Sequence, residues 1–88
     1  MIHGFVQGVF FRESTRRVAQ EAGVTGWVRN LLDGQVEAVV EGPADAVAEV
    51  IAFCHEGPAG ARVDQLETFD EPVEGLADFA VRLTPPRA

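Results

Sequence analysis

The stretch with the clearest chemical potential covers residues 4–12 and reads GFVQGVFFR. Gly4 and Gly8 can adopt backbone angles that other residues disfavour, so successive N–H groups can point into one concavity. Arg12 adds a guanidinium group that stays charged and matches a pair of phosphate oxygens. The stretch predicts a turn from a short strand into a helix, whose positive dipole end lies behind the turn. Taken alone, it fits an anion-binding loop and a tight connection with a solvated arginine equally well.

A second polar candidate is Asn30, the last residue of a predicted strand over residues 25–30. The dipeptide Asp33-Gly34 is a strong hairpin signal and joins this strand to another over residues 35–41. Asparagine is common at the start of a turn, where its side chain forms a hydrogen bond with the nearby backbone. The spacing by itself favours that structural role for Asn30.

Two amphipathic helices are predicted to support these candidates. The first covers residues 11–22, with one apolar stripe, and Gly23 provides its C-terminal stop. The second follows Gly42-Pro43, with Gly acceptable at the N-cap and Pro favoured at the first helical position, and ends before Gly57-Pro58. Cys54 lies on the apolar stripe of the second helix, which favours a packing role over a nucleophilic one.

The remaining strands complete the expected fold. Met1-Ile2-His3 can be only the tail of a first strand, residues 62–69 predict a later one, and an acidic loop covers residues 70–75. Residues 79–84 alternate in polarity and predict a short last strand before Pro85-Pro86. Two split βαβ halves predict an α+β ferredoxin-like sandwich, βαββαβ, with an antiparallel sheet and both helices on one face.

Composition narrows the function. The 88-residue chain predicts one domain, and its formal charge of −7 opposes binding to nucleic acid or anionic lipid. No lysine is present, which excludes a P-loop, and the absence of Tyr weakens an RNA-binding interpretation. His3 and His55 lack ligand-spaced partners, so no metal site is expected. A lone cysteine, no apolar run of membrane-span length and no secretion-type leader predict a cytoplasmic protein.

The segments GFVQGVFFR, GWVRNLLDGQVE and EGP, in this order and at these distances, closely resemble the acylphosphatase family. The resemblance covers nearly the whole chain. It implies hydrolysis of the carboxyl–phosphate bond of an acyl phosphate to a carboxylate and inorganic phosphate, with no metal or organic cofactor. A small-molecule acyl phosphate is therefore the expected partner, and we expect a monomer.

The resemblance also assigns roles to residues. Arg12 matches the phosphate-binding arginine of the family, and Asn30 matches the asparagine that positions the attacking water. The backbone donors for the phosphate correspond to Val6, Gln7, Gly8, Val9 and Phe10. The family match reverses the structural interpretation of Asn30 that spacing alone favours.

Two departures from the family pattern bear on these expectations. Phe5 stands where a basic residue is common, which removes one positive charge beside the phosphate. The first strand is short, as if truncated at its start, although it belongs in the sheet interior, and this predicts low stability. The alternative is a non-catalytic acylphosphatase-like domain that binds an anion or regulates a partner.

Overall fold

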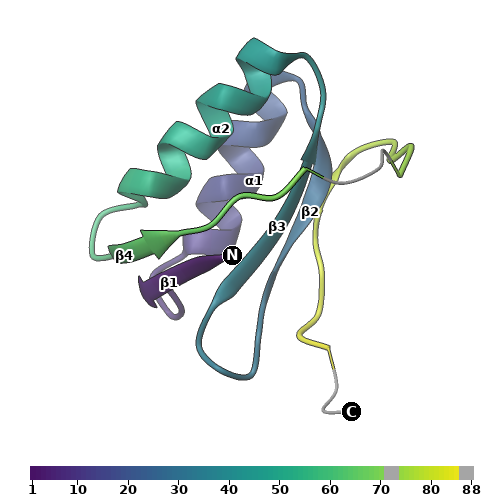
Figure 1. Cartoon of the computed structure of the whole chain (residues 1–88). Coiled ribbons are helices and arrows are strands. Elements are labelled where there is room, and N and C mark those ends of the chain that lie inside the picture. Colours follow the sequence, from purple (N-terminus) through teal and green to yellow (C-terminus); the bar gives the residue numbers. More distant parts are fainter. Residues whose placement is uncertain (71–73, 86–88) are drawn as a thin grey trace.

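The computed structural model describes residues 1–70 and 74–85 (Figure 1). Its elements are β1 (Ile2–Phe5), α1 (Phe11–Ala22), β2 (Thr25–Asn30), β3 (Val36–Glu41), α2 (Ala44–Glu56), β4 (Arg62–Leu66) and β5 (Phe79–Val81). This order confirms the predicted succession, and α1 has both of its predicted ends. Among the described residues, no helix is long and apolar enough to cross a membrane.

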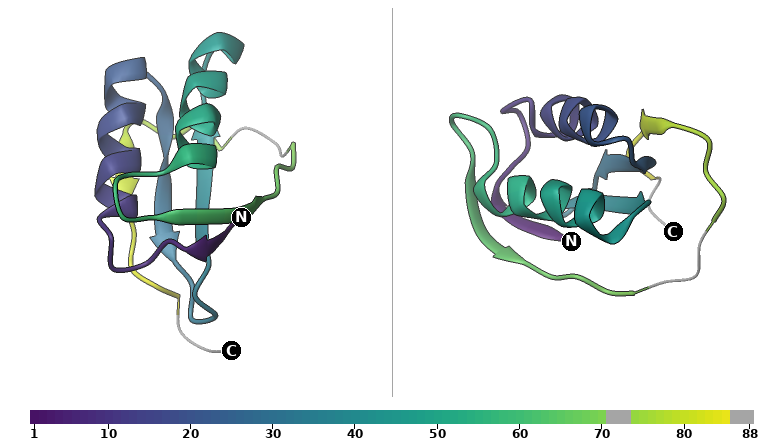
Figure 2. Two further views of the ribbon diagram at one scale, coloured as in Figure 1. Left: turned by 90° about the vertical axis from the view of Figure 1, so that its left-hand side faces the viewer. Right: turned by 90° about the horizontal axis from the view of Figure 1, so that it is seen from above.

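Both helices cover one face of the sheet, so the molecule has two layers (Figure 2). The strand order is β4-β1-β3-β2-β5, and the first four strands pair antiparallel as a split βαβ fold requires. The expectation of a wholly antiparallel sheet is wrong in one respect, because β5 runs parallel to β2, with Val28 opposite Val81. The chain leaves β4 at one edge and crosses to the opposite edge, where no hairpin dictates the strand direction. The ferredoxin-like α+β class is confirmed, with a mixed sheet.

The helix α1 is fixed at both ends by left-handed residues. Phe10 precedes it with φ 60°, and Gly23 follows it with φ 76° and donates its N–H to the last turn. Phe11, Thr15 and Ala19 form its buried face. This face sets the rotation of α1 against the sheet and therefore the direction of Arg12.

The strand β1 is longer than the predicted tail, because it continues through Gly4 to Phe5 with an irregularity after His3. A Cβ at Gly4 would lie 2.1 Å from the carbonyl oxygen of Arg62, so the close pairing with β4 requires glycine. With β3, β1 pairs only through Ile2 and Val36. The short first strand thus leaves most of one β3 edge without a strand partner among the described residues.

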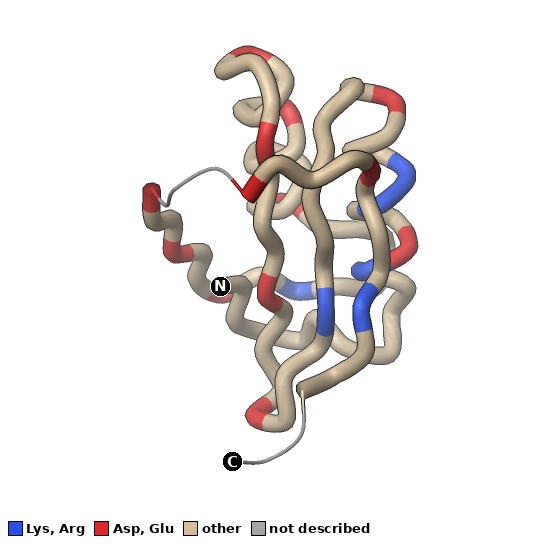
Figure 3. The backbone as a smooth tube through the Cα atoms, turned by 90° about the vertical axis from the view of Figure 1, so that its right-hand side faces the viewer, with Lys and Arg blue, Asp and Glu red and all other residues tan. Residues whose placement is uncertain are grey.

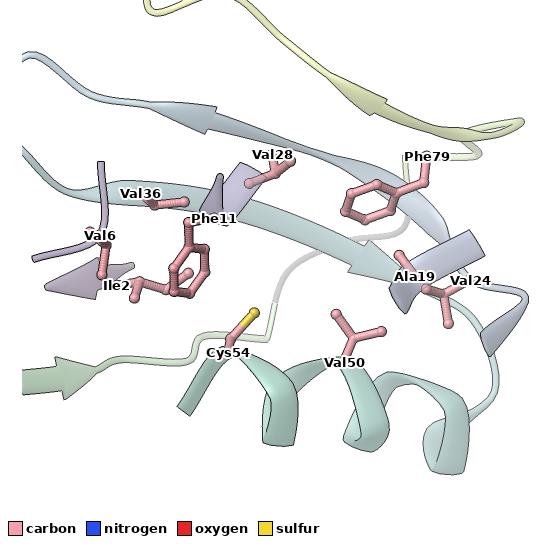
Figure 4. Packing of buried hydrophobic residues seen from close by; sticks show 10 residues of the cluster. All are labelled: Ile2, Val6, Phe11, Ala19, Val24, Val28, Val36, Val50, Cys54 and Phe79. Atoms are coloured by element: carbon pink, nitrogen blue, oxygen red, sulfur yellow. The ribbon is translucent and has the colours of Figure 1, made fainter. Parts of the chain in front are cut away.

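The core lies between the helices and the sheet (Figure 4). The aromatic rings of Phe11 and Phe53 pack at a centroid distance of 6.2 Å, which ties α1 to α2. The fully buried or nearly buried apolar side chains are Ile2, Val6, Phe11, Ala19, Val24, Val28, Val36, Val50, Cys54 and Phe79. They hold the start of α1 against the ends of β1 and β2.

Small differences from the predicted boundaries remain. The helix α2 begins at Ala44 with Pro43 as its N-cap, one residue later than predicted. The strands β4 and β5 end at Leu66 and Val81, before the ends of the alternating patterns. Part of the predicted acidic loop, residues 71–73, and Pro86 lie outside the described residues.

Candidate active site

A cavity of about 360 Å³ lies beside the start of α1. Its lining comes from the 6–10 loop, the first turn of α1, the end of β2 and the edge strand β5. The lining residues are Val6, Gly8, Phe10, Phe11, Arg12, Glu13, Asn30 and Val81. The fold therefore brings the two polar side chains singled out in the sequence, Arg12 and Asn30, to one cavity of the size of a small-molecule site.

The loop backbone has the shape of an anion cradle. Gly8 has φ 76° and Phe10 has φ 60°, so left-handed residues bend the chain around the cavity. Alternation of this kind turns successive N–H groups to one side. No side chain caps the start of α1, so its first N–H groups also lack the usual side-chain acceptor. These donors and the positive end of the helix dipole favour an anion here.

The Arg12 guanidinium is the main fixed positive charge in the cavity lining. The four ion pairs within residues 1–70 and 74–85 all involve other cations, so Arg12 has no acidic partner there. Its neighbour Glu13 is instead paired with Arg16, whose Nε donates to Glu13 at 2.9 Å. Arg12 is left to interact with a ligand.

Asn30 contributes a polar atom with no partner. It ends β2 opposite Val36, and its Oδ1 is buried without a hydrogen bond to any described residue. A buried amide oxygen normally accepts a hydrogen bond from protein or water. An O–H or N–H donor inside the cavity would satisfy it.

Gln7 and Val9 do not line the cavity. The Gln7 side chain points away and donates to the carbonyl oxygens of Leu31 and Gln35 at 2.8 and 3.0 Å. Val9 packs against the core. Their assignment as backbone donors stays a prediction, and the sequence analysis missed the side-chain bonds by which Gln7 fastens the loop to the β2–β3 turn.

Three further lining residues, Phe11, Glu13 and Val81, were not predicted as site residues. Glu13 lies in the first turn of α1, directly after Arg12. Its place beside Arg12 in the sequence could have indicated that it borders the same site. The Arg16 hydrogen bond to its carboxylate holds the pKa of Glu13 below its usual value. Val81 reaches the cavity only through the parallel pairing of β5 with β2, for which the sequence gives no local signal.

The other candidates lie elsewhere. Phe5 is exposed at the end of β1 and lies outside the cavity lining. Burial raises the pKa of the Cys54 thiol to about 11, which fits its predicted packing role. His3 Nε2 lies 2.6 Å from a Glu67 carboxylate oxygen. Within the described part of the chain, no three His, Cys, Asp or Glu residues are placed to hold a metal ion.

The distribution of charge limits how an anion can be attracted. The arginine positions lie in the right half of Figure 3, whereas the acidic positions are spread over both halves. With a formal charge of −7, the molecule as a whole repels an anion. Attraction must come from the local donors of the cavity.

Comparison with known proteins gives a consistent result. The sequence model of the acylphosphatase family matches residues 1–81. The chain is 58% identical over 82 residues to an acylphosphatase of Rubrobacter xylanophilus, covering 92% of this chain and 74% of the relative. It is 55% identical over 80 residues to an acylphosphatase of Gloeobacter violaceus, covering 91% and 86%.

A solved acylphosphatase from Coxiella burnetii superposes with a TM-score of 0.89 at 44% identity, covering 92% of this chain and 85% of that one. The likeness therefore extends over the fold that surrounds the cavity.

Proposed function

Because the chain belongs to the acylphosphatase family, we propose that its cavity hydrolyses acyl phosphates to a carboxylate and inorganic phosphate. The observation that carries the proposal is the meeting, in one cavity beside a left-handed loop, of the Arg12 guanidinium and the Asn30 amide oxygen, neither of which has a partner among the described residues. Phosphoryl transfer is catalysed mainly by positioning and charge stabilisation, which this arrangement can provide.

The phosphoryl group binds in the loop. Its oxygens accept hydrogen bonds from the backbone N–H groups of residues 6–10 and from the fork of Arg12 donors. This charge-assisted pairing holds the phosphorus in a fixed place and balances charge on the equatorial oxygens in the transition state. The uncapped start of α1 adds to the favourable potential.

The attacking water is held by Asn30. A water O–H donates to Oδ1, which satisfies the buried oxygen and directs a lone pair at the phosphorus. The water oxygen bonds to phosphorus while the bond from phosphorus to the acyl oxygen breaks. The bond pair leaves with the carboxylate, and both water protons end on the phosphate as dihydrogen phosphate, so no external proton is needed.

The substrate phosphate itself accepts the proton of the attacking water. Glu13 is the one carboxylate in the cavity lining, and its pairing with Arg16 lowers its pKa and makes it a weak base. The acyl leaving group is already good, so strong general-base assistance is not required.

A pair of variants separates the two roles. Arg12→Ala removes a phosphate ligand and should raise the inhibition constant of inorganic phosphate as well as lower kcat by roughly 10²–10³. Asn30→Ala should lower kcat by a similar factor while phosphate inhibition stays close to wild type. Near-normal turnover in either folded variant, or an unchanged response to phosphate in Arg12→Ala, would contradict these roles. A folded wild-type chain that binds phosphate without turnover would instead indicate an anion-binding or regulatory domain.

We further infer that the chain works as a cytoplasmic monomer that binds neither nucleic acid nor membrane. The inference is supported by the net negative charge and by an unpaired, buried Cys54. Light scattering after size exclusion would test the oligomeric state, and a mass of two chains would contradict it.

A further inference from the structure

The cavity has an apolar side in addition to its polar one. Phe10 and Val81 line it and are unusually exposed for large apolar residues, at 80% and 40% of their surface. They come from the loop before α1 and from the edge strand β5, two elements that both border the phosphate-binding backbone. An apolar group attached to a phosphate bound in the loop would meet these side chains.

Phe10 is held in a costly conformation. It is the single non-glycine residue with positive φ among residues 1–70 and 74–85. An aromatic residue in the left-handed region is strained, and strain of this kind concentrates at binding sites. The exposed ring gains little from the core in return. A ligand that covers the ring would explain why a phenylalanine stands here.

Val81 is fixed in place by its neighbours. It pairs with Val28 of β2, and the Arg82 N–H donates to the Val28 carbonyl oxygen at 2.9 Å. The Arg82 guanidinium also lies 4.8 Å from the centroid of the Trp27 ring, on which it stacks. These contacts hold the edge strand firmly, so Val81 forms a preorganised wall.

Glu13 adds a negative charge to the same cavity. Its carboxylate is ionised at neutral pH and is paired with Arg16, further along α1. The phosphoryl end of a substrate is matched by Arg12 and the loop. A second anionic group at the acyl end would meet Glu13 and the apolar side chains instead.

Resting on the function proposed above, we propose that Phe10, Val81 and Glu13 select the acyl group, favouring apolar uncharged acyl phosphates over those with a second carboxylate. The apolar pair gains by covering hydrocarbon. Glu13 repels the second carboxylate of a charged acyl phosphate. Selectivity therefore comes both from apolar contacts that favour one substrate and from repulsion that disfavours the other.

Three substrates test the proposal through kcat/KM: benzoyl phosphate, 4-carboxybenzoyl phosphate and acetyl phosphate. We expect the wild type to prefer benzoyl over 4-carboxybenzoyl phosphate by about tenfold. Phe10→Asn keeps a residue that tolerates the left-handed region, and Val81→Thr keeps the branched shape. Each should lower kcat/KM for benzoyl phosphate about fivefold more than kcat/KM for acetyl phosphate, because acetyl offers little apolar surface.

Three further variants, one of them a control, complete the design. Glu13→Gln should raise the 4-carboxybenzoyl to benzoyl ratio by about fivefold, and Phe10→Leu should restore the benzoyl preference that Phe10→Asn loses. Phe69→Asn is the matched control, because Phe69 is also exposed but lies outside this cavity, and its ratios should equal those of the wild type.

The outcomes separate the two proposals. A wild type that hydrolyses all three substrates with ratios unmoved by the cavity variants would overturn the acyl selection and leave the proposed function standing. Equal losses on acetyl and benzoyl phosphate in Phe10→Asn would also overturn it, since the ring would then serve the loop. A wild type that hydrolyses none of the three would refute the proposed function itself.

Discussion

The side-chain amide of Gln7 fastens the 6–10 loop to the turn after β2. Its nitrogen donates to Leu31 and Gln35 carbonyl oxygens, and the Gln35 oxygen also accepts the Leu31 N–H. Asn30 lies directly before this turn. One side chain therefore fixes the distance between the loop and the proposed water ligand.

Gln7→Ala should lower kcat/KM for benzoyl phosphate by roughly tenfold, because the loop loses its fixed distance from Asn30. Loss of two hydrogen bonds should also lower the free energy of unfolding by about 1–2 kcal/mol. Steady-state kinetics and urea denaturation measure both effects. Gln35→Ala keeps both carbonyl acceptors and serves as the control. Unchanged kinetics in Gln7→Ala with reduced stability would show that the bonds serve only the fold.

The residues of the cavity were predictable in unequal measure. Residue type and spacing left the role of Arg12 open and favoured a turn role for Asn30, and only the resemblance to the acylphosphatase family assigned both to a site. The fold places both at the cavity. The left-handed Phe10 was not predictable, since propensity assigns that region to glycine or asparagine. The side-chain bonds of Gln7 depend on contacts between distant segments, which local pattern does not encode.

Among the elements, α1 and the β2–β3 pair were predictable because periodicity, Gly23 and Asp33-Gly34 mark their limits locally. The direction of β5 was not, because it depends on a connection from the opposite edge of the sheet. Glu41, at the end of β3, helps to fix that connection: its carboxylate accepts hydrogen bonds from the N–H groups of Glu74 and Leu76. Those backbone bonds, chiefly the one from Glu74, lower the pKa of Glu41 below its ordinary value of 4.5.

The sign of this shift predicts an acid-sensitive contribution to stability. Because the folded state binds the Glu41 proton less tightly than the unfolded state, ionised Glu41 stabilises the fold above about pH 4.5, and the contribution disappears as pH falls through the folded pKa. Glu41→Gln should therefore be less stable than the wild type at pH 7, and the difference should shrink as the pH falls below about 4.5. Thermal unfolding across this range measures the difference.

Glu49→Gln, at an exposed position of α2, is the control and should show no such convergence. A deficit in Glu41→Gln that is the same at pH 3 and pH 7 would contradict the role of the Glu41 charge.

For the molecule as a whole, the weakest part of the sheet lies between β1 and β3, which pair at one position. A second cavity of about 660 Å³ borders β3 and the segment after β4, and Val50 and Cys54 help to line it. Unpaired strand edges and incomplete packing both lower stability. The low stability expected from the short first strand stays a prediction with a structural basis.

We expect this 88-residue chain to unfold below the mesophilic range of about 45–65 °C. Differential scanning calorimetry at neutral pH without phosphate measures the transition. A single cooperative transition inside or above that range would show that the rest of the sheet compensates for the sparse β1–β3 pairing.

The most direct test of the central claim is hydrolysis of benzoyl phosphate by the purified chain, followed by ultraviolet absorbance. Arg12→Ala and Arg17→Ala are assayed alongside, because both residues lie on α1 but only Arg12 lines the cavity. We predict turnover in the wild type and in Arg17→Ala, and a loss of roughly 10²-fold or more in Arg12→Ala. No turnover by a folded wild type, or equal turnover in all three proteins, would contradict hydrolysis at this cavity.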